Sequence, residues 1–588
     1  MSDLTIQRAR AAAVAPRRRR AGSWRGTGIK AWLAPAGVIA VLLLLVVPPV
    51  AVLIQTSLTT ESKGLAGGTL TLQHYEALLD NPRLLVSTWN SLLFSTLSTV
   101  LSILFGGVLG WVVVRTNAPF GPLAYLTAVV SLGTPYLLHV ASWTFLLGRT
   151  GPFNEAWRDL TGSTGLLFDV YSIWGMVLIQ GMLWSPLVFL LMSAVFRRAN
   201  AEMEEAARVC GASIAATVWR ISFRLAWPAI VGMALFVFIR NLESFDVPVL
   251  IGGPAKIYVL TTDIYLAMTE MPPRMGHAAA FSFILIGVVS IALVFYSRFA
   301  RNADRYASVT GKGYRPRPFD LGRWRWVGGA VVIVNFLAVL VLPLLATLWI
   351  SLMPFARPIR LSALKLLTLE NYRIVLAEPR YVELAFNTIT VAAGAATAAM
   401  ALALLAGWLV VRRWPGSRTI EQLINIPIVF PGIVVGVALL ILALRVPFPL
   451  YGTLAVIMLA FLIRFLPYGM RYAHSGVMQI HRELEEAAGV AGAGQPTILR
   501  RIVVPLLVPA LMSGWLFIFL IGANELSMSV LLAGPRTQVM SVAMLDQWAS
   551  GQSVEVFALG MCWSIFMTMC ALVFYALARR TLSGEGGL

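Results

Sequence analysis

Charged residues are scarce in this chain. Lys, Arg, Asp and Glu together make up 12% of its 588 residues, whereas a typical soluble domain carries about 25%. Hydrophobic residues make up 58%. So few charges in so apolar a sequence exclude an ordinary soluble protein and are typical of a protein that crosses a membrane several times.

Metal-binding and nucleotide-binding motifs are also missing. The three cysteines, Cys210, Cys562 and Cys570, form no CxxC pair, and the five histidines form no HxxxH or HxxE array. There is no GxxxxGK[ST] loop to hold the phosphates of ATP. No Ser-His-Asp arrangement stands in a plausible context. We therefore expect no catalytic residues, no metal site and no cofactor in this chain.

Long apolar runs are what the sequence has instead. They are continuous, as at residues 40–51 and 331–349, rather than alternating, so we predict spanning helices and not a barrel. The predicted fold class is an all-α polytopic membrane protein with about twelve spans. Six lie near 31–57, 89–114, 120–147, 173–196, 226–244 and 277–297, and six near 326–353, 386–411, 419–443, 453–477, 505–523 and 554–578.

Basic residues divide the chain into two halves. The net charge is +19, and the basic residues cluster between apolar runs, which indicates membrane topology rather than nucleic-acid binding. We predict a basic cytoplasmic tail (1–30), a first domain (31–297), a basic cytoplasmic linker (298–325), a second domain (326–580) and a C-terminal tail (581–588). Both termini are then cytoplasmic.

The two domains are copies of each other. Three pairs of motifs recur at an offset of 297 residues, and from Pro186 and Pro467 onward the offset is 281. The 297-residue pairs are Thr71-Leu72 with Thr368-Leu369, Pro82-Arg83 with Pro379-Arg380, and Asn90-Ser91 with Asn387-Thr388. The second domain therefore lacks 16 residues, which the polar external loop at 148–171 accounts for. The domains share one orientation, a parallel repeat about the membrane normal.

One polar segment occurs in both copies, after the fourth span of each domain. Each copy reads Glu-Ala-Ala, three residues, Gly, nine residues, Ile, and an acidic first turn followed by a glycine predicts a helix, a turn and a second helix. The first copy consists of Glu205, Ala206, Ala207, Gly211 and Ile221, and the second of Glu486, Ala487, Ala488, Gly492 and Ile502. Two copies in register favour two equivalent partners over a simple connector.

This pattern resembles the EAA loop of binding-protein-dependent ABC importer permeases. The second copy is close to the family pattern, whereas the first has Phe223-Arg224 where Leu-Pro is usual. Two permease domains in one chain look like the fused permeases of iron(III) importers; polyamine, thiamine and phosphonate systems remain alternatives. The resemblance implies two MetI-like, type I six-helix repeats in the bacterial inner membrane.

The resemblance also implies the partners. Each EAA loop would dock on one of two copies of an ABC ATPase subunit, which bind the ATP and Mg. A solute-binding protein would dock on the external face.

Polar residues at the end of each fifth span are the candidates for the translocation path. Intramembrane polar residues tend to line water-filled paths, and these precede Gly253-Pro254 and Gly534-Pro535, which indicate a broken helix. The candidates are Asn241, Glu243, Asp246, Asn524 and Glu525. Alternatively, they cap the span and contact only water. Asn335 and Arg464 are weaker candidates, since each can simply bond a neighbouring helix.

Two other classes of protein compete with this interpretation. A secondary transporter with two parallel six-helix halves would also have a basic central loop. It would need ion-coupling carboxylates near the middle of the membrane, whereas most acids here lie in loops or near span ends. Residues 115–119 also lack the Gly-Asp-Arg signature of many such carriers. A membrane-embedded enzyme would need a nucleophile or metal cluster that the sequence does not offer.

Overall fold

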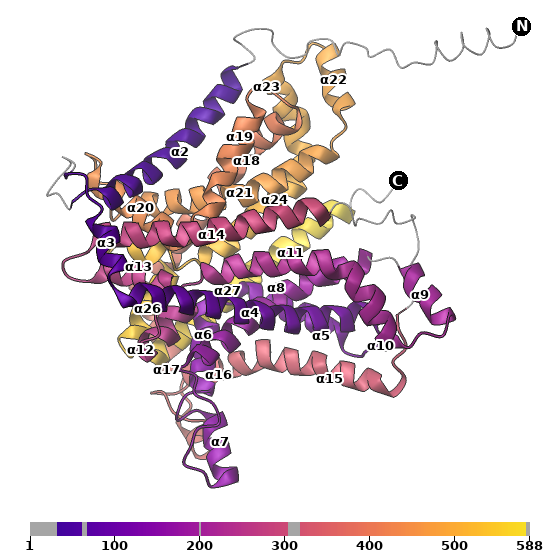
Figure 1. Ribbon diagram of the computed structural model, residues 1–588, viewed down its shortest axis with the longest axis vertical. Helices are drawn as coiled ribbons and strands as arrows, with labels where there is room; N and C mark the ends of the chain where they lie inside the picture. Colours follow the sequence, from indigo (N-terminus) through magenta and orange to yellow (C-terminus); the bar gives the residue numbers. More distant parts are fainter. Residues whose placement is uncertain (1–31, 61–67, 199–200, 304–317, 584–588) are drawn as a thin grey trace, which may run out of the picture.

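The protein is a bundle of helices in the computed structural model, which describes residues 32–60, 68–198, 201–303 and 318–583 (Figure 1). In these ranges the only β-pairings are two isolated bridges, Thr59 with Leu70 and Thr116 with Phe319. The predicted tail at 1–30, half of the predicted linker (residues 304–317) and residues 584–588 lie outside the described residues. The predicted all-α class is confirmed.

Ten helices in the described residues are long and apolar enough to cross a membrane. In the first half they are α2 (Leu33–Leu58), α4 (Pro82–Arg115), α8 (Ile173–Arg198), α11 (Phe223–Leu242) and α14 (Met275–Ala303). In the second half they are α15 (Arg325–Phe336) with α16 (Leu342–Ser351), α18 (Pro379–Val411), α21 (Leu454–Gln479), α24 (Val504–Ala523) and α27 (Ser553–Ser583). Each lies within or close to a predicted span, and the chain is an integral membrane protein.

The third span of each half is broken rather than continuous. In the second half, α19 (Ser417–Asn425) and its 3-10 extension meet α20 (Gly432–Arg445) at a bend of 102°. In the first half, α5 (Gly121–Gly133) and α6 (Tyr136–Leu146) form the corresponding bent pair. Pro431 and Pro135 stand at the two breaks. Proline lacks the N–H that a continuing helix needs, and it disfavours helical dihedrals in the residue before it.

The two halves are interlocked through their first spans. Helix α2 packs on α19 and α20 of the second half, whereas α15 and α16 pack on α5 and α6 of the first half. Arg445, at the end of α20, donates hydrogen bonds to Gln55 (2.9 Å) and Thr56 (2.8 Å) of α2. Each half therefore holds the other in place, so the bundle is one body.

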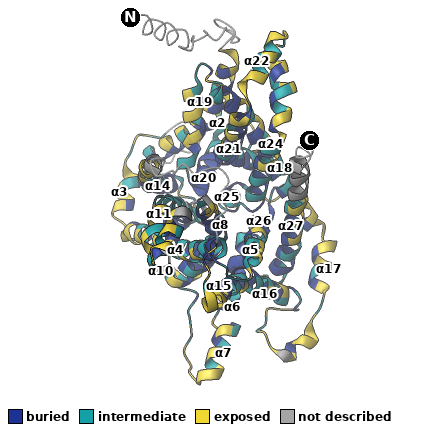
Figure 2. Ribbon diagram, turned by 90° about the vertical axis from the view of Figure 1, so that its right-hand side faces the viewer, coloured by how far each residue is buried: buried dark blue, intermediate teal, exposed yellow. Residues whose placement is uncertain are grey.

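Shorter helices gather at the two ends of the bundle. Helices α9 (Ala201–Val209) and α22 (Arg482–Val490) lie where α4 and α18 end, at the right and the top of Figure 1, and we name this side of the bundle the EAA end. The opposite end, the α7 end, carries α3 (Gln73–Leu79), α7 (Pro152–Thr161), α13 (Leu260–Thr269), α17 (Glu370–Ala377) and α26 (Met540–Ala549). Buried residues gather in the middle of the bundle, and α7 and α22 are mostly exposed (Figure 2). Helix α7 occupies the loop that the second half lacks.

Close packing of α4 on α8 depends on a glycine. A Cβ atom on Gly106 would lie 2.5 Å from the carbonyl oxygen of Ser185, whereas a Cβ on the neighbouring Gly107 would meet nothing nearer than 4.0 Å. Small residues allow membrane helices to approach closely in this way. We expect Gly106→Ala to lower the free energy of unfolding by about 1–3 kcal/mol, and Gly107→Ala to leave it unchanged or slightly higher. Thermal unfolding of the two detergent-solubilised variants checks this, and equal midpoints would contradict it.

Candidate functional site

Each EAA segment (residues 205–221 and 486–502) folds as the helix, turn and helix that the sequence predicts. Helices α9 and α22 end two residues before Gly211 and Gly492, which have φ angles of +83° and +86°. Such left-handed dihedrals strain any residue with a Cβ. The turn is closed in both halves by a backbone bond, from Ala212 N to Ala207 O and from Ala493 N to Ala488 O, each 3.0 Å. The chain then runs through α10 (Ile214–Thr217) or α23 (Gln495–Ile498) into the fifth span.

The EAA residues lie on an open surface. No residue of α22 is buried. Ala206, Ala487 and both turn glycines are exposed; Glu205, Ala207, Ile221, Glu486, Ala488 and Ile502 are partly buried. Helix α9 lies at the right and α22 at the top of Figure 1, and each presents an exposed alanine, Ala206 or Ala487, that a partner could contact.

Each EAA segment is joined by an ion pair to the second span of its own half. Neither pair was predicted from the sequence. Glu204, directly before the first EAA glutamate, pairs with Arg115 at the end of α4, and both side chains are buried. Glu485 pairs with Arg412 at the end of α18 at 2.6 Å. Arg115 and Arg412 are 297 residues apart, and Glu204 and Glu485 are 281 apart. A search of the sequence for oppositely charged residues that recur at these two offsets could therefore have found both ion pairs.

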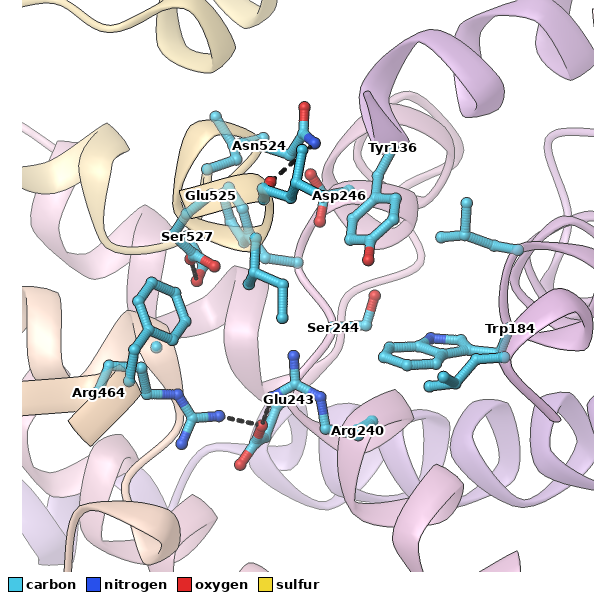
Figure 3. Close-up of a pocket in the computed structure, with 18 of the residues that line it drawn as sticks. Tyr136, Trp184, Arg240, Glu243, Ser244, Asp246, Arg464, Asn524, Glu525 and Ser527 are labelled. Atoms are coloured by element: carbon cyan, nitrogen blue, oxygen red, sulfur yellow. Dashed lines mark hydrogen bonds and ion pairs between the residues drawn. The ribbon is translucent and has the colours of Figure 1, made fainter. Parts of the chain in front are cut away.

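A cavity of about 140 Å³ lies between the two halves (Figure 3). One wall comes from α8 and α11 of the first half, and the other from α21 and α24 of the second. Helix α11 ends at Leu242 and α24 at Ala523, so the stretches that follow are loops inside the bundle. Both fifth spans are therefore broken, as predicted.

Four of the five candidate path residues line this cavity. Glu243, Asp246, Asn524 and Glu525 all contribute to its wall. Asn241 does not. Its side chain is buried, accepts a hydrogen bond from Gln180 (2.9 Å) and donates one to Thr99 (3.1 Å), so it joins α11 to α8 and α4.

A buried ion network crosses the cavity from one half to the other. Glu243 accepts from Arg240 of its own half (2.7 Å) and from Arg464 of the second half (2.5 Å), as the dashed lines in Figure 3 mark. Arg464 also donates to the carbonyl of Phe430 (3.0 Å), beside the break in the third span. A buried charge is tolerated only when it is paired. Arg464, a weaker candidate from the sequence, is thus a central residue of the cavity.

The other two carboxylates of the cavity form no ion pair that the structure describes. Glu525 accepts from Ser527 and from the N–H of Met528 (3.3 Å). Asp246 lies beside Tyr136, whose hydroxyl group is directed toward Ser244 (Figure 3). Three carboxyl side chains and two guanidinium groups line the cavity. Within the described residues, no three His, Cys, Asp or Glu side chains gather as metal ligands would.

Comparison with known protein families shows to which family the chain belongs. Residues 21–305 and 399–583 match the family described as "Binding-protein-dependent transport system inner membrane component". The chain is a permease of this family. Two matches in one chain confirm that two permease domains are fused.

Some curated relatives match most of the permease, and others match only part of it. A "Ferric transport system permease protein FbpB" from Actinobacillus pleuropneumoniae is 26% identical over 492 residues, covering 82% of this chain and 70% of the relative. A "Probable ABC transporter permease protein y4fN" from Sinorhizobium fredii is 25% identical and covers 89% of this chain and 90% of the relative. A "Putrescine transport system permease protein PotI" from Escherichia coli is 30% identical but covers only 29% of this chain.

Proposed function

We propose that this permease is the membrane subunit of an ATP-driven importer of iron(III). A solute-binding protein delivers the solute, and two copies of a separate ABC ATPase subunit bind ATP and Mg and supply the energy. The observation that carries the proposal is the pair of EAA segments, which project as matching open helices from the EAA end of a duplicated permease.

The EAA segments are the docking sites for the ATPase subunits. Glu205, Ala206, Ala207 and Gly211 face one subunit, and Glu486, Ala487, Ala488 and Gly492 face the other. When two ATPases close on ATP, they draw the EAA helices together and turn the halves from inward-facing to outward-facing. Because each EAA segment continues directly into the fifth span, this motion reaches the loops that line the cavity.

Orientation in the membrane follows from this docking. The EAA end faces the cytoplasm and the α7 end faces outward, where the binding protein docks. Arg115, Arg197 and Arg412 lie at the EAA end of their helices, in agreement with the excess of basic residues on the cytoplasmic side of inner-membrane proteins. Both chain termini are then cytoplasmic.

Two features support iron(III) as the solute. Relatives that match most of the chain include two proteins with "ferric transport system permease" in their names. The cavity also offers carboxylate and hydroxyl oxygens from Glu243, Asp246, Glu525 and Tyr136, which suit hard cations. Glu243 already pairs with two arginines, so Asp246 and Glu525 are the carboxylates that a passing cation meets.

A polyamine is the second candidate. Putrescine and spermidine permeases also match, over 29% and 37% of the chain, and a polyamine is a cation that the same carboxylates would attract.

The binding protein distinguishes the two solutes. We expect the partner binding protein, purified without added ligand, to contain iron by metal analysis and no polyamine by mass spectrometry. We also expect proteoliposomes with all subunits to accumulate radioactive iron. Bound putrescine, with no iron uptake, would contradict iron as the solute and leave the importer assignment in place.

A further inference from the structure

We propose that α4 and α18 are struts that carry the motion of the EAA segments across the membrane to the cavity loops. Arg115 and Arg412 are the positioning residues that clamp each strut to its EAA segment. This inference rests on the proposed function, since the struts transmit the motion of docked ATPases.

The clamp at the EAA end is built the same way in both halves, and it is buried in the first half and partly buried in the second. The side chains of Arg115 and Glu204 are 3% and 5% exposed, and those of Arg412 and Glu485 are 12% and 11% exposed. Each carboxylate accepts a further bond, Glu204 from the hydroxyl of Ser222 (2.6 Å) and Glu485 from the indole of Trp408 (3.2 Å). Charge-assisted bonds of this kind are strong and directional.

The clamp is a main attachment of α22 to the bundle. Because α22 buries none of its residues, it has little apolar packing to hold it in place. Arg412 donates both to Glu485 and to the carbonyl of Ile480 (3.1 Å), just before α22 begins. A movement of α22 therefore pulls directly on the end of α18.

The far ends of the struts are attached by a second pair of matching contacts. In the first half, Asn90 donates to the carbonyl of Tyr258 (3.0 Å), and Ser91 accepts from the N–H of Leu260 (2.9 Å). In the second half, Asn387 donates to the carbonyl of Gln538 (3.1 Å), and Thr388 accepts from the N–H of Met540 (2.8 Å). These bonds fix the starts of α13 and α26, and they give the repeated Asn-Ser and Asn-Thr pairs a physical role.

The segments held there are bonded in turn to the cavity loops. Thr261 of α13 donates to the carbonyl of Ser244 (2.8 Å), and Ser541 of α26 donates to the carbonyl of Glu525 (2.7 Å). Ser244 and Glu525 both line the cavity and are 281 residues apart. Each half thus has a continuous series of contacts across the membrane. The clamp joins the EAA segment to the strut, the strut contacts α13 or α26, and that helix is bonded to the cavity loop.

The strut is stiffer than the direct route through the fifth span. Helices α4 and α18 run for 34 and 33 residues, and their only prolines stand in the first turn, where proline is tolerated. The route through the fifth span contains π-helical turns at Val218–Ser222 and Leu499–Val503, followed by Pro228 or Pro509 inside α11 or α24. Such turns and prolines kink helices and weaken their hydrogen-bond ladder.

Arg412→Met tests the clamp, with the exposed neighbour Arg413→Met as the matched control. The open EAA surface is untouched, so we expect the ATPase to co-purify with both variants. In proteoliposomes with ATPase and binding protein, Arg412→Met should lower the solute imported per ATP hydrolysed by about 10-fold. Arg413→Met should retain the wild-type ratio.

A second variant, Glu485→Gln, carries a smaller risk of misfolding. It shows whether a lower transport-to-ATP ratio comes from the lost positioning of the strut or only from lower stability of the protein. Glu485→Gln keeps the shape of the side chain and removes its charge, and we expect the same fall in the transport-to-ATP ratio. The double variant should be no worse than either single one, because both remove one interaction. A wild-type ratio in Arg412→Met, or in a folded Glu485→Gln, would overturn the strut. Lack of ATP-driven uptake by the wild-type complex would instead overturn the proposed function.

Discussion

The double variant Glu205→Lys and Glu486→Lys is expected to lose the ATPase from the purified complex and to reduce solute uptake to background. Both glutamates lie on open EAA helices at the EAA end of the bundle. A lysine there opposes the acidic first turn that favours each helix N-terminus, and it reverses the charge that the ATPase meets. Co-purification of a tagged permease with its ATPase measures docking, and uptake into proteoliposomes measures transport.

A charge reversal outside the EAA segments is the control for this result. Glu421 of α19 is exposed, and Glu421→Lys should leave ATPase binding and uptake unchanged. Both variants should insert and purify like the wild type, because none of the three glutamates is among the buried residues. ATPase recovery from Glu205→Lys/Glu486→Lys equal to that from the control would show that the ATPase docks elsewhere.

The second large effect is expected from Arg464→Met. This change removes the ion pair between Arg464 and Glu243 and leaves the buried carboxylate of Glu243 with Arg240 alone. Breaking a buried ion pair by removing one partner typically costs about 3–5 kcal/mol. We therefore expect a clear drop in the thermal unfolding midpoint of the detergent-solubilised protein and a loss of uptake.

Two further variants test whether the effect of Arg464→Met comes from the lost ion pair. Arg471→Met alters an exposed arginine of the same helix and should leave the midpoint unchanged. The double variant Arg464→Met/Glu243→Gln removes the uncompensated charge and should recover part of the lost stability. A midpoint for Arg464→Met equal to that of Arg471→Met would show that the ion network does not join the halves.

The spans and EAA segments could be predicted from sequence because their signals are local. A continuous apolar run predicts a membrane helix by itself, and a glycine after an acidic helix predicts a turn. The breaks in the third spans also had a local signal, since Pro135 and Pro431 interrupt both apolar runs.

Contacts between distant residues were harder to predict. Glu243 and Arg464 are separated by 221 positions, and either residue could equally have contacted a neighbouring helix. Asn241 is a polar residue at the end of a fifth span, as a path residue would be, yet α11 is oriented so that the side chain of Asn241 bonds to Gln180 and Thr99. Only the arrangement of helices in space determines which polar side chains meet in the cavity and which bond between helices.

The most direct test of the central claim is solute uptake by purified components in proteoliposomes. An importer permease requires its ATPase, its binding protein and ATP, so we predict accumulation only when all of them are present, with or without a proton gradient. Uptake driven by a proton gradient with this chain alone would contradict the account and would identify a secondary transporter.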